Sequence, residues 1–385
     1  FRNIIKRGSH NSCAGGIYYS CFRQLKILNL NKIFSSKAPA RVCLYGDHQD
    51  YLGLPVIACA INKYIHVEGK KNNSKILSFH LVDLNRTVSI YIDKISLKPI
   101  KGDHIGFVLY TLHKLGCQIN TGMTIKIKSN IYINAGISSS SALVVSLVDF
   151  FTKSFVFPKK VDKKLIAEIA FKSEVIEQKG SGGRMDQYTI AISNTIFLET
   201  QNNGKYELLD NPFSSIIVAN SGIKKETDFD LRRLKTKTLS VIDKIKNLNS
   251  DFDLKKVLPS ELKTYSKFLD HDSYDILYAA VHNYKITIDV YEELKKKRPK
   301  IDFLLTKINE HHQILKNKLK ITIPKIDNMI SKAFNAGALG AKIIGSGGGG
   351  SIMVIAKKDF EHSVIKSLQD SGCTQVSKVK ILKDK

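Results

Sequence analysis

The sequence contains no tryptophan and no long apolar run, since its longest apolar stretch, Leu52 to Ile61, is interrupted by Pro55. A membrane-spanning helix needs about 18 to 20 apolar residues, so the sequence predicts no transmembrane segment. The six cysteines form no C-x-x-C pair, and the histidines show no zinc-finger spacing, so no transition-metal site is indicated. We interpret the cysteines as reduced thiols and expect a cytoplasmic location.

Acidic residues are also few, with 35 Asp and Glu against 60 Lys and Arg, which leaves a net charge of +25. Such an excess can indicate binding to nucleic acids or to an anionic membrane. The lysines, however, lie along the whole chain in mixed-charge segments, and no Arg-aromatic repeat offers a stacking platform for bases. We therefore favour a solvated basic surface, with small polyanions such as nucleotides as partners rather than nucleic acid or membrane.

The length of 385 residues suits two to three domains of about 150 residues. Hydrophobic residues make up 43% and charged residues 25%, which is typical of a globular protein and excludes a disordered or collagen-like chain. Residues 1–35 differ from the rest, because they contain no acid and show no clear periodicity. We interpret them as a leader of uncertain order, and both a transit peptide and a truncated leader remain open.

The later sequence mixes predicted strands and helices. Apolar runs predict strands over residues 42–45, 56–60, 76–81, 88–92 and 123–127, and helices over 106–115, from 142 onwards and over 162–179. Strands at 195–199 and 216–219 precede a helical region over about 228–319, in which we expect His311 and His312 to be a solvated pair. The end of the chain predicts helix 326–336, a glycine-rich turn, strand 352–356, another helix and a strand near 376–382.

Because strands and helices occur in both halves without strict alternation, the pattern favours an α+β fold. We expect two lobes that meet around residue 200, formed by residues 36–200 and 201–385.

Two segments are rich in small residues. Residues 134–141, Asn-Ala-Gly-Ile-Ser-Ser-Ser-Ser, open a helix, and a helix N-terminus with small side chains suits a phosphate group, because its backbone N–H groups are unpaired and its dipole is positive. A serine-rich helix cap without a ligand is equally compatible with this segment. Residues 345–350 contain five glycines, which predicts close approach of a ligand or of another loop rather than a flexible linker.

Several charged residues accompany these loops: Arg41, the run Asp47-His-Gln-Asp-Tyr, Glu174, and Asp186 within a glycine-rich turn. Separately, each acid is an ordinary surface residue. Together with two anion-type loops, they indicate phosphoryl transfer, which needs a phosphate cradle, a metal-holding acid and hydroxyl, an orienting carboxylate and a cation.

These segments resemble the motifs of the GHMP kinases, and within that family the galactokinase branch. Residues 38–51 are similar to a signature in which A-P-G-R-V leads into G-E-H-T-D-Y, and residues 135–142 to the phosphate motif G-G-G-L-S-S-S-A-S. Residues 183–187 resemble G-I-M-D-Q, residues 337–350 resemble the third, glycine-rich motif, and the spacing from Glu174 to Asp186 equals that between the family's magnesium glutamate and catalytic aspartate. The motifs occur in order over about residues 37–385.

The resemblance implies a two-lobed α+β GHMP kinase fold, with the active site in the cleft between the lobes and with ATP and Mg²⁺ bound there. Asp186 would be the catalytic aspartate and Arg41 the cation beside it, and Ser140 and Glu174 would hold Mg²⁺. The implied phosphate-binding residues are Gly136, Ser138, Ser139, Ser140 and Ser141. The implied substrate-binding residues are Asp47, His48, Asp50, Tyr51, Gly183, Gly347, Gly348 and Gly349.

The sequence departs from the galactokinase pattern at Asp47, which replaces a glutamate, and at Gln49, which replaces a threonine. The resemblance implies phosphorylation of a sugar hydroxyl, the anomeric hydroxyl of galactose or a related hexose. A mevalonate kinase-like enzyme ranks second, because the carboxylates of Asp47 and Asp50 would repel an acidic substrate. A non-catalytic sugar and ATP sensor on the same fold, and a basic RNA-associated protein, are the alternatives from other classes.

Overall fold

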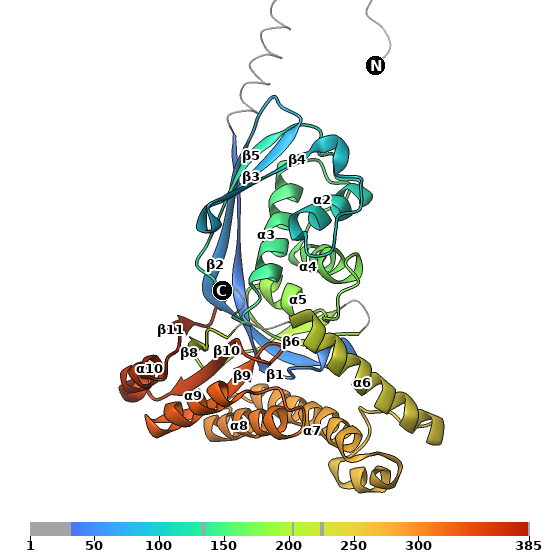
Figure 1. Cartoon of the computed structure of the whole chain (residues 1–385), viewed down its shortest axis with the longest axis vertical. Helices are drawn as coiled ribbons and strands as arrows, with labels where there is room; N and C mark the ends of the chain where they lie inside the picture. The colour runs from blue at the N-terminus through green and yellow to red at the C-terminus, as the bar shows by residue number, and fades with distance from the viewer. Residues whose placement is uncertain (1–31, 133–134, 202–203, 224–226, 384–385) are drawn as a thin grey trace, which may run out of the picture.

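The chain is built around two β-sheets (Figure 1). The computed structural model describes residues 32–132, 135–201, 204–223 and 227–383. Within these residues, a seven-stranded sheet has the order β4-β3-β5-β2-β6-β7, with β1 paired to β2. Its strands are β1 Ile33–Tyr45, β2 Val56–Lys71, β3 Ile76–Leu81, β4 Arg86–Tyr91, β5 Met123–Ser129, β6 Thr195–Glu199 and β7 Lys205–Leu208.

The second sheet, in the same described part of the chain, has four strands in the order β11-β8-β10-β9. These strands pair antiparallel throughout. They are β8 Ser215–Asn220, β9 Ala338–Ile344, β10 Ser351–Ala356 and β11 Gln375–Lys380. With helices packed on both sheets, the expected α+β fold class is confirmed.

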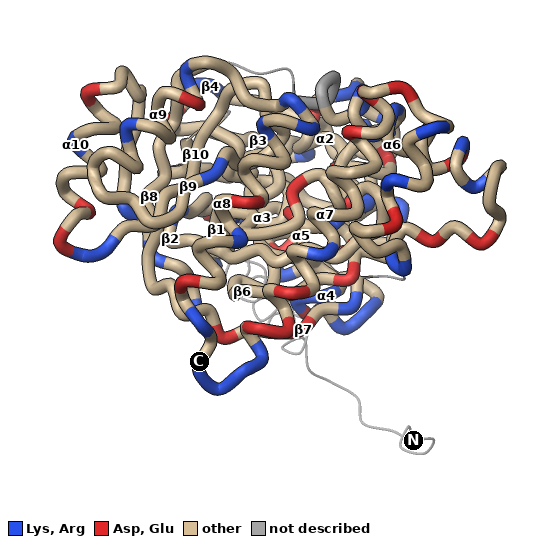
Figure 2. Tube along the Cα trace, turned by 90° about the horizontal axis from the view of Figure 1, so that it is seen from below, with Lys and Arg blue, Asp and Glu red and all other residues tan. Residues whose placement is uncertain are grey.

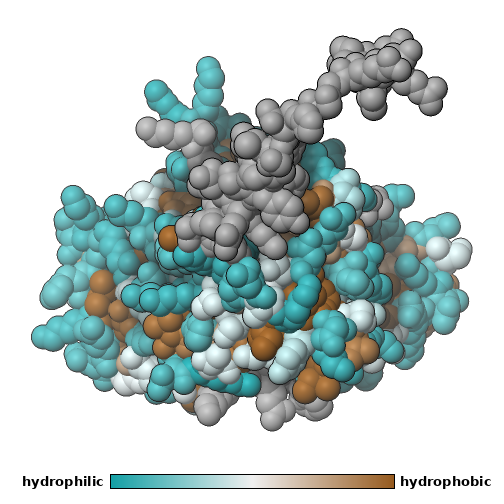
Figure 3. All heavy atoms as spheres, turned by 90° about the horizontal axis from the view of Figure 1, so that it is seen from above, coloured by the Kyte–Doolittle hydropathy of each residue, from teal (hydrophilic) through white to brown (hydrophobic). Residues whose placement is uncertain are grey.

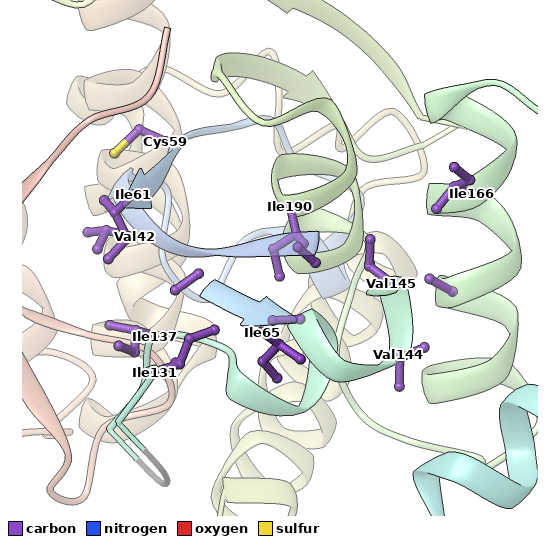
Figure 4. Packing of buried hydrophobic residues seen from close by; sticks show 14 of the residues in the cluster. Val42, Cys59, Ile61, Ile65, Ile131, Ile137, Val144, Val145, Ile166 and Ile190 are labelled. Carbon is purple, nitrogen blue, oxygen red and sulfur yellow. The ribbon is translucent and has the colours of Figure 1, made fainter. Parts of the chain in front are cut away.

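The helices between β5 and β6 cover one side of the seven-stranded sheet, together with α2 (Figure 1). They are α2 His104–Lys114, α3 Ser139–Ser154, α4 Lys163–Phe171, which continues into a π-helical turn at Lys172–Ile176, and α5 Met185–Ile192. Val144 and Val145 of α3 and Ile190 of α5 belong to the same core as Ile65 of β2 (Figure 4). The helices α3 and α5 both pack on this core, and both begin at the site described below.

The remaining helices are α6 Thr227–Leu248, a 3₁₀ segment at Pro259–Phe268, α7 His271–Leu294, α8 Ile301–Asn317, α9 Pro324–Asn335 and α10 Glu361–Asp370. Of these helices, α8, α9 and α10 pack on the four-stranded sheet, whereas α7 contacts β1 and β2 of the first sheet and α6 packs against α7. The helical region predicted over 228–319 is divided, with breaks over residues 249–258, 269–270 and 295–300. The last break contains Pro299, which lacks the N–H that a continuous helix needs. None of the described helices combines the length and the apolarity needed to cross a membrane.

Several predicted strands are ends of longer ones. The predicted runs 42–45 and 56–60 are the buried ends of β1 and β2, whose other ends alternate buried and exposed residues. Ile33 already belongs to β1, so the last residues of the expected leader are part of the sheet, and residues 1–31 lie outside the described residues. The strands β7 and β9 and the helix α5 were not predicted from the sequence. The strand β9 was hidden by Gly340, which indicated a turn.

The expectation that His311 and His312 are solvated is wrong, because both side chains are fully or almost fully buried. They lie on the buried stripe of α8 with Leu304, Ile308 and Leu315, and α8 packs on β9. Burial, reinforced by nearby Lys342, lowers the pKa of His311 to about 3 and that of His312 to about 4, so both rings are neutral at neutral pH. The helical spacing from Leu304 was the available signal.

Positions with charges of both signs are interspersed along the traced chain, as expected for mixed-charge segments (Figure 2). Hydrophilic side chains also cover most of the visible face in the view from above, with hydrophobic ones scattered between them (Figure 3). In Figure 2, the positions of Lys and Arg are distributed over many elements of the described chain rather than gathered in one segment.

Candidate active site

One cavity of about 430 Å³ is lined by residues from both halves of the chain. Its walls come from β1 and the β1–β2 connection, the N-termini of α3 and α5, the π-helical turn after α4, and the β9–β10 turn. Most residues that the sequence analysis selected line it: Arg41, Asp47, His48, Asp50, Tyr51, Gly136, Ser138, Ser139, Ser140, Ser141, Glu174, Gly183 and Asp186. The tertiary structure thus brings together residues that lie up to 145 positions apart, as in the pair formed by Arg41 and Asp186.

Arg41 and Asp186 form a two-pronged ion pair at this cavity. Arg41 Nε donates to Asp186 Oδ1 at 2.7 Å, and Nη2 donates to Oδ2 at 2.8 Å. Burial lowers the pKa of Arg41, but the adjacent Asp186 carboxylate more than compensates, so that this pKa is raised. The Arg41 side chain is 5% exposed and that of Asp186 is 25% exposed, so the pair orients a carboxylate that still faces the cavity.

Asp186 lies in the first turn of α5 rather than in the glycine-rich turn predicted for it. The turn ends at Arg184, and α5 begins at Met185. A carboxylate at a helix N-terminus is stabilised by the helix dipole. The helix also gives Asp186 a rigid backbone, which a glycine-rich turn would not provide.

The serine-rich segment forms the N-terminus of α3 on the cavity wall. Ser138 has a left-handed backbone (φ 63°), and its hydroxyl donates to Asp186 Oδ2 instead of capping the helix. Gly136 accepts a hydrogen bond from Arg41 Nη1 at 2.8 Å through its carbonyl. The first N–H groups of α3 have no intrahelical partners, so this wall can bind an anion such as a phosphate.

Glu174 lies in the π-helical turn, a local irregularity that often occurs at functional sites. Its Oε2 accepts a hydrogen bond from Gln187 Nε2 at 2.7 Å. Gln187 is almost fully buried and lines the cavity, yet the sequence analysis assigned it no role. Its position directly after Asp186 was the only signal.

The oxygen groups of Glu174 and Ser140 fit a Mg²⁺ ion. Mg²⁺ prefers hard oxygen donors and is commonly held by one or two carboxylates together with substrate phosphates and water. Among the described residues, no group of three or more His, Cys, Asp or Glu side chains could hold a metal by itself. A site with one carboxylate and one hydroxyl therefore agrees with a metal that arrives with a nucleotide.

The β1–β2 connection supplies the other carboxylates. Asp50 begins a short 3₁₀ helix, Asp50–Leu52, and its Oδ1 accepts the backbone N–H of Tyr51 at 2.9 Å. Burial and the nearby Asp186 charge raise the pKa of Asp50 to about 6. Gly183 lies directly against Asp50, because a Cβ built on Gly183 would come within 2.5 Å of the Asp50 carboxyl group.

Asp47, which the resemblance assigns to the substrate, also forms an ion pair with a buried lysine. Its Oδ2 accepts a hydrogen bond from Lys342 Nζ at 2.5 Å, and both side chains are buried. Burial by itself would raise the pKa of Asp47, but the nearby positive charge of Lys342 outweighs this effect and the pKa is lowered. The carboxylate therefore remains ionised. Lys342 was not predicted to belong to the site, and its only signal in the sequence is that it interrupts the apolar run of β9.

The glycine-rich segment divides into two parts. Gly345 and Ser346 line the cavity, whereas Gly347, Gly348 and Gly349, which the resemblance assigns to the substrate, do not. Gly348 N–H donates to the Ile321 carbonyl at 2.8 Å, and a Cβ on Gly349 would lie 2.9 Å from the Ile223 carbonyl. These glycines allow close approach of other chain segments, which was one of the two expected explanations.

Comparison with known proteins agrees with this fold. The family models for the N-terminal and C-terminal domains of GHMP kinases match residues 104–194 and 300–372, and a galactokinase galactose-binding signature matches residues 28–71. The chain belongs to the GHMP kinase family. Within that family it is galactokinase-like, which confirms the resemblance seen in its motifs.

Galactokinases and mevalonate kinases are about equally similar to this chain in sequence. A galactokinase of Pyrococcus furiosus is 26% identical over 339 residues, which is 85% of this chain and 90% of the relative. A mevalonate kinase of Pyrococcus abyssi is 26% identical over 338 residues, which is 84% of this chain and 89% of the relative.

Among solved structures, Lactococcus lactis galactokinase complexed with galactose superposes with a TM-score of 0.79 at 18% identity, covering 95% of this chain and 98% of that chain. The Methanococcus jannaschii mevalonate kinase superposes with a TM-score of 0.68 at 21% identity, covering 92% and 99%. Both likenesses establish the fold.

Proposed function

We propose that this GHMP kinase uses ATP to phosphorylate a hydroxyl group of a sugar, the anomeric hydroxyl of galactose or of a related hexose. The observation that carries this proposal is the Arg41–Asp186 ion pair, which presents an oriented carboxylate to the same cavity as the N-terminus of α3 and Glu174. The galactose-binding signature at residues 28–71 and the galactokinase relatives support a sugar as the acceptor.

In the proposed mechanism, Asp186 accepts or orients the proton of the sugar hydroxyl that attacks the γ-phosphate of ATP. Arg41 holds Asp186 in place and offsets negative charge on the transferred group. Gly136 and Ser138 to Ser141 surround the phosphates, so that backbone N–H groups and hydroxyls can donate to them. Mg²⁺, when bound through Ser140 and Glu174, would neutralise charge on the β- and γ-phosphates.

The acceptor would lie against the β1–β2 connection. Asp47, His48, Asp50, Tyr51 and Gly183 line that side of the cavity. Carboxylates accept hydrogen bonds from sugar hydroxyls, whereas they would repel the carboxylate of an acidic substrate. This chemistry favours a neutral sugar over mevalonate, although the mevalonate kinase relatives keep that acid as the second candidate.

A coupled ADP-release assay tests the proposal. The purified protein would be given ATP, Mg²⁺ and a panel that contains galactose, other hexoses, uronic acids and mevalonate, and the phosphorylated carbon would be identified by ³¹P NMR. We expect turnover with a neutral hexose and a sugar 1-phosphate as product. Turnover with mevalonate alone would favour the second candidate, and sugar binding without ADP release would favour a sensor.

We also propose that the two lobes divide near residue 200, as residues 36–200 and 201–385, and that the protein is cytoplasmic. The two separate sheets support two lobes, although β7 returns to the first sheet after residue 200. The described cysteines, Cys43, Cys59, Cys117 and Cys373, are all unpaired, which supports a reducing compartment.

A further inference from the structure

The buried Lys342–Asp47 pair joins the two sheets beside the cavity, which Asp47 lines and Lys342 does not. Lys342 belongs to β9 of the four-stranded sheet, and Asp47 follows β1 of the seven-stranded sheet. Lys342 Nζ lies 2.5 Å from Asp47 Oδ2 and 3.0 Å from the carbonyl oxygen of Cys43. The two side chains are 0% and 2% exposed. Lys342 is therefore fully enclosed, and its charge is directed to the start of the β1–β2 connection.

The surroundings of this pair leave one carboxylate oxygen unused. Asp47 Oδ1 is buried and has no hydrogen-bond partner among the described residues, and Asp47 lines the cavity. The neighbouring His311 is fully buried, and neither of its ring nitrogens has a partner in the same part of the chain. A buried acceptor without a donor is unfavourable, so a donor on a bound molecule would satisfy Asp47 Oδ1.

We propose that Lys342 is a positioning residue that sets acceptor specificity, because it holds Asp47 Oδ2 and thereby directs Oδ1 to a neutral hydroxyl group of the substrate. This inference rests on the proposed sugar kinase function. A substrate carboxylate has no proton to donate to Oδ1 at neutral pH. The positive charge of Lys342 is already paired with Asp47, so it is not available to bind that carboxylate. The Lys342–Asp47 pair therefore favours a polyhydroxylated neutral acceptor over an acidic one.

The test compares the preferred sugar with each of its monodeoxy analogues, in the wild-type protein and in Lys342→Met. In the wild type, removal of the hydroxyl that contacts Asp47 should lower kcat/KM by about ten- to a hundredfold, as expected for a hydrogen bond to a charged group. In Lys342→Met, this loss of kcat/KM should shrink to within about threefold, and the KM for the sugar should rise. The KM for ATP should stay within about twofold of the wild type, because the hydrogen bonds of Lys342 go to Asp47 and the Cys43 carbonyl and not to the N-terminus of α3.

Lys318→Met is the matched control. Lys318 also pairs with a buried aspartate, at 2.7 Å from Asp275 Oδ1, but neither residue lines the cavity. The Lys318→Met variant should show the same loss of kcat/KM with each monodeoxy sugar as the wild type. Lys342→Arg should lose that pattern, because the guanidinium fork can bind both carboxylate oxygens of Asp47 and so occupy Oδ1.

Lys342→Met leaves Asp47 buried without a cation and can fail to fold. The double variant Asp47→Asn with Lys342→Met removes both charges. It should also no longer show the large loss of kcat/KM with the sugar that lacks the hydroxyl contacting Asp47. Unchanged deoxy penalties in either variant, with a uniform loss of kcat/KM, would overturn the role of Lys342. A wild-type protein that phosphorylates no sugar would instead overturn the proposed function, and this inference with it.

Discussion

Two aspartates at the cavity are each paired with a cation, but the two pairs differ in access. Asp186 meets Arg41 through two hydrogen bonds and keeps a quarter of its side chain exposed. Asp47 meets Lys342 through one oxygen, and both groups are sealed from solvent. The same ion-pair chemistry therefore leaves one carboxylate open to a reacting group and fixes the other within the wall.

The choice of cation matches this difference. Arginine binds both carboxylate oxygens and can keep a third contact, here to the Gly136 carbonyl, so it orients Asp186 without covering it. Lysine is a point charge that engages one oxygen of Asp47 and leaves the other available. We infer that Asp186 acts on the reacting hydroxyl and that Asp47 acts in acceptor recognition.

The largest expected effect separates these two roles. Asp186→Asn should lower kcat by about 10²- to 10⁴-fold, because the amide cannot accept the hydroxyl proton. ATP affinity, measured by isothermal titration calorimetry, should remain within a few-fold of the wild type. Near-full activity in the ADP-release assay would contradict the catalytic assignment.

Asp50 adds a third carboxylate, whose ionisation is opposed by burial and by Asp186. Folding raises its pKa from 3.8 to about 6, so as the pH rises the unfolded chain loses this proton at a lower pH than the folded chain does. The free energy of unfolding should therefore fall by about 3 kcal/mol as pH rises from about 4 to above 6.

Asp50→Asn removes this titration. The variant should be more stable than the wild type at pH 7.5, and the gain should vanish near pH 3.5, as measured by urea unfolding. Asp251→Asn, at an exposed site, should change stability little at either pH. A gain for Asp50→Asn that is the same at both pH values would contradict the raised pKa.

Glu174 tests whether the metal side of the cavity is separate from both aspartate pairs. Glu174→Ala should raise the Mg²⁺ concentration for half-maximal activity by about tenfold or more, because it removes a carboxylate ligand. The KM for the sugar should change little. An unchanged Mg²⁺ titration would count against the metal role.

Adjacent glycines provide the smallest and most local test. Gly183→Ala should raise the KM for the sugar by about three- to tenfold, because the added methyl group would lie 2.5 Å from the Asp50 carboxyl group and 2.6 Å from its backbone carbonyl carbon and would displace Asp50. Gly182→Ala is its control, since a Cβ there would meet nothing within 4 Å. Equal effects of the two substitutions would show that Asp50 does not depend on the packing of Gly183.

Much of the site was predictable because its signals are local. The serine run before α3, Glu174 and Asp186 lie in short motifs whose order and spacing resemble those of a known family, and they converge on one cavity. The helix α5 around Asp186 was not predicted, because the preceding glycines indicated a turn. The segment Gly347 to Gly349 was assigned to the substrate, since glycine content cannot tell a ligand from a neighbouring loop.

The sequence by itself determined the α+β class, the family resemblance and the cation and acid that form the Arg41–Asp186 pair. Only the tertiary structure decided that Lys342 and His311 are buried beside Asp47. The physical reason is distance along the chain: Lys342 and Asp47 are 295 positions apart. A lysine in an apolar strand or a histidine on a helix acquires its environment only when another sheet packs against it.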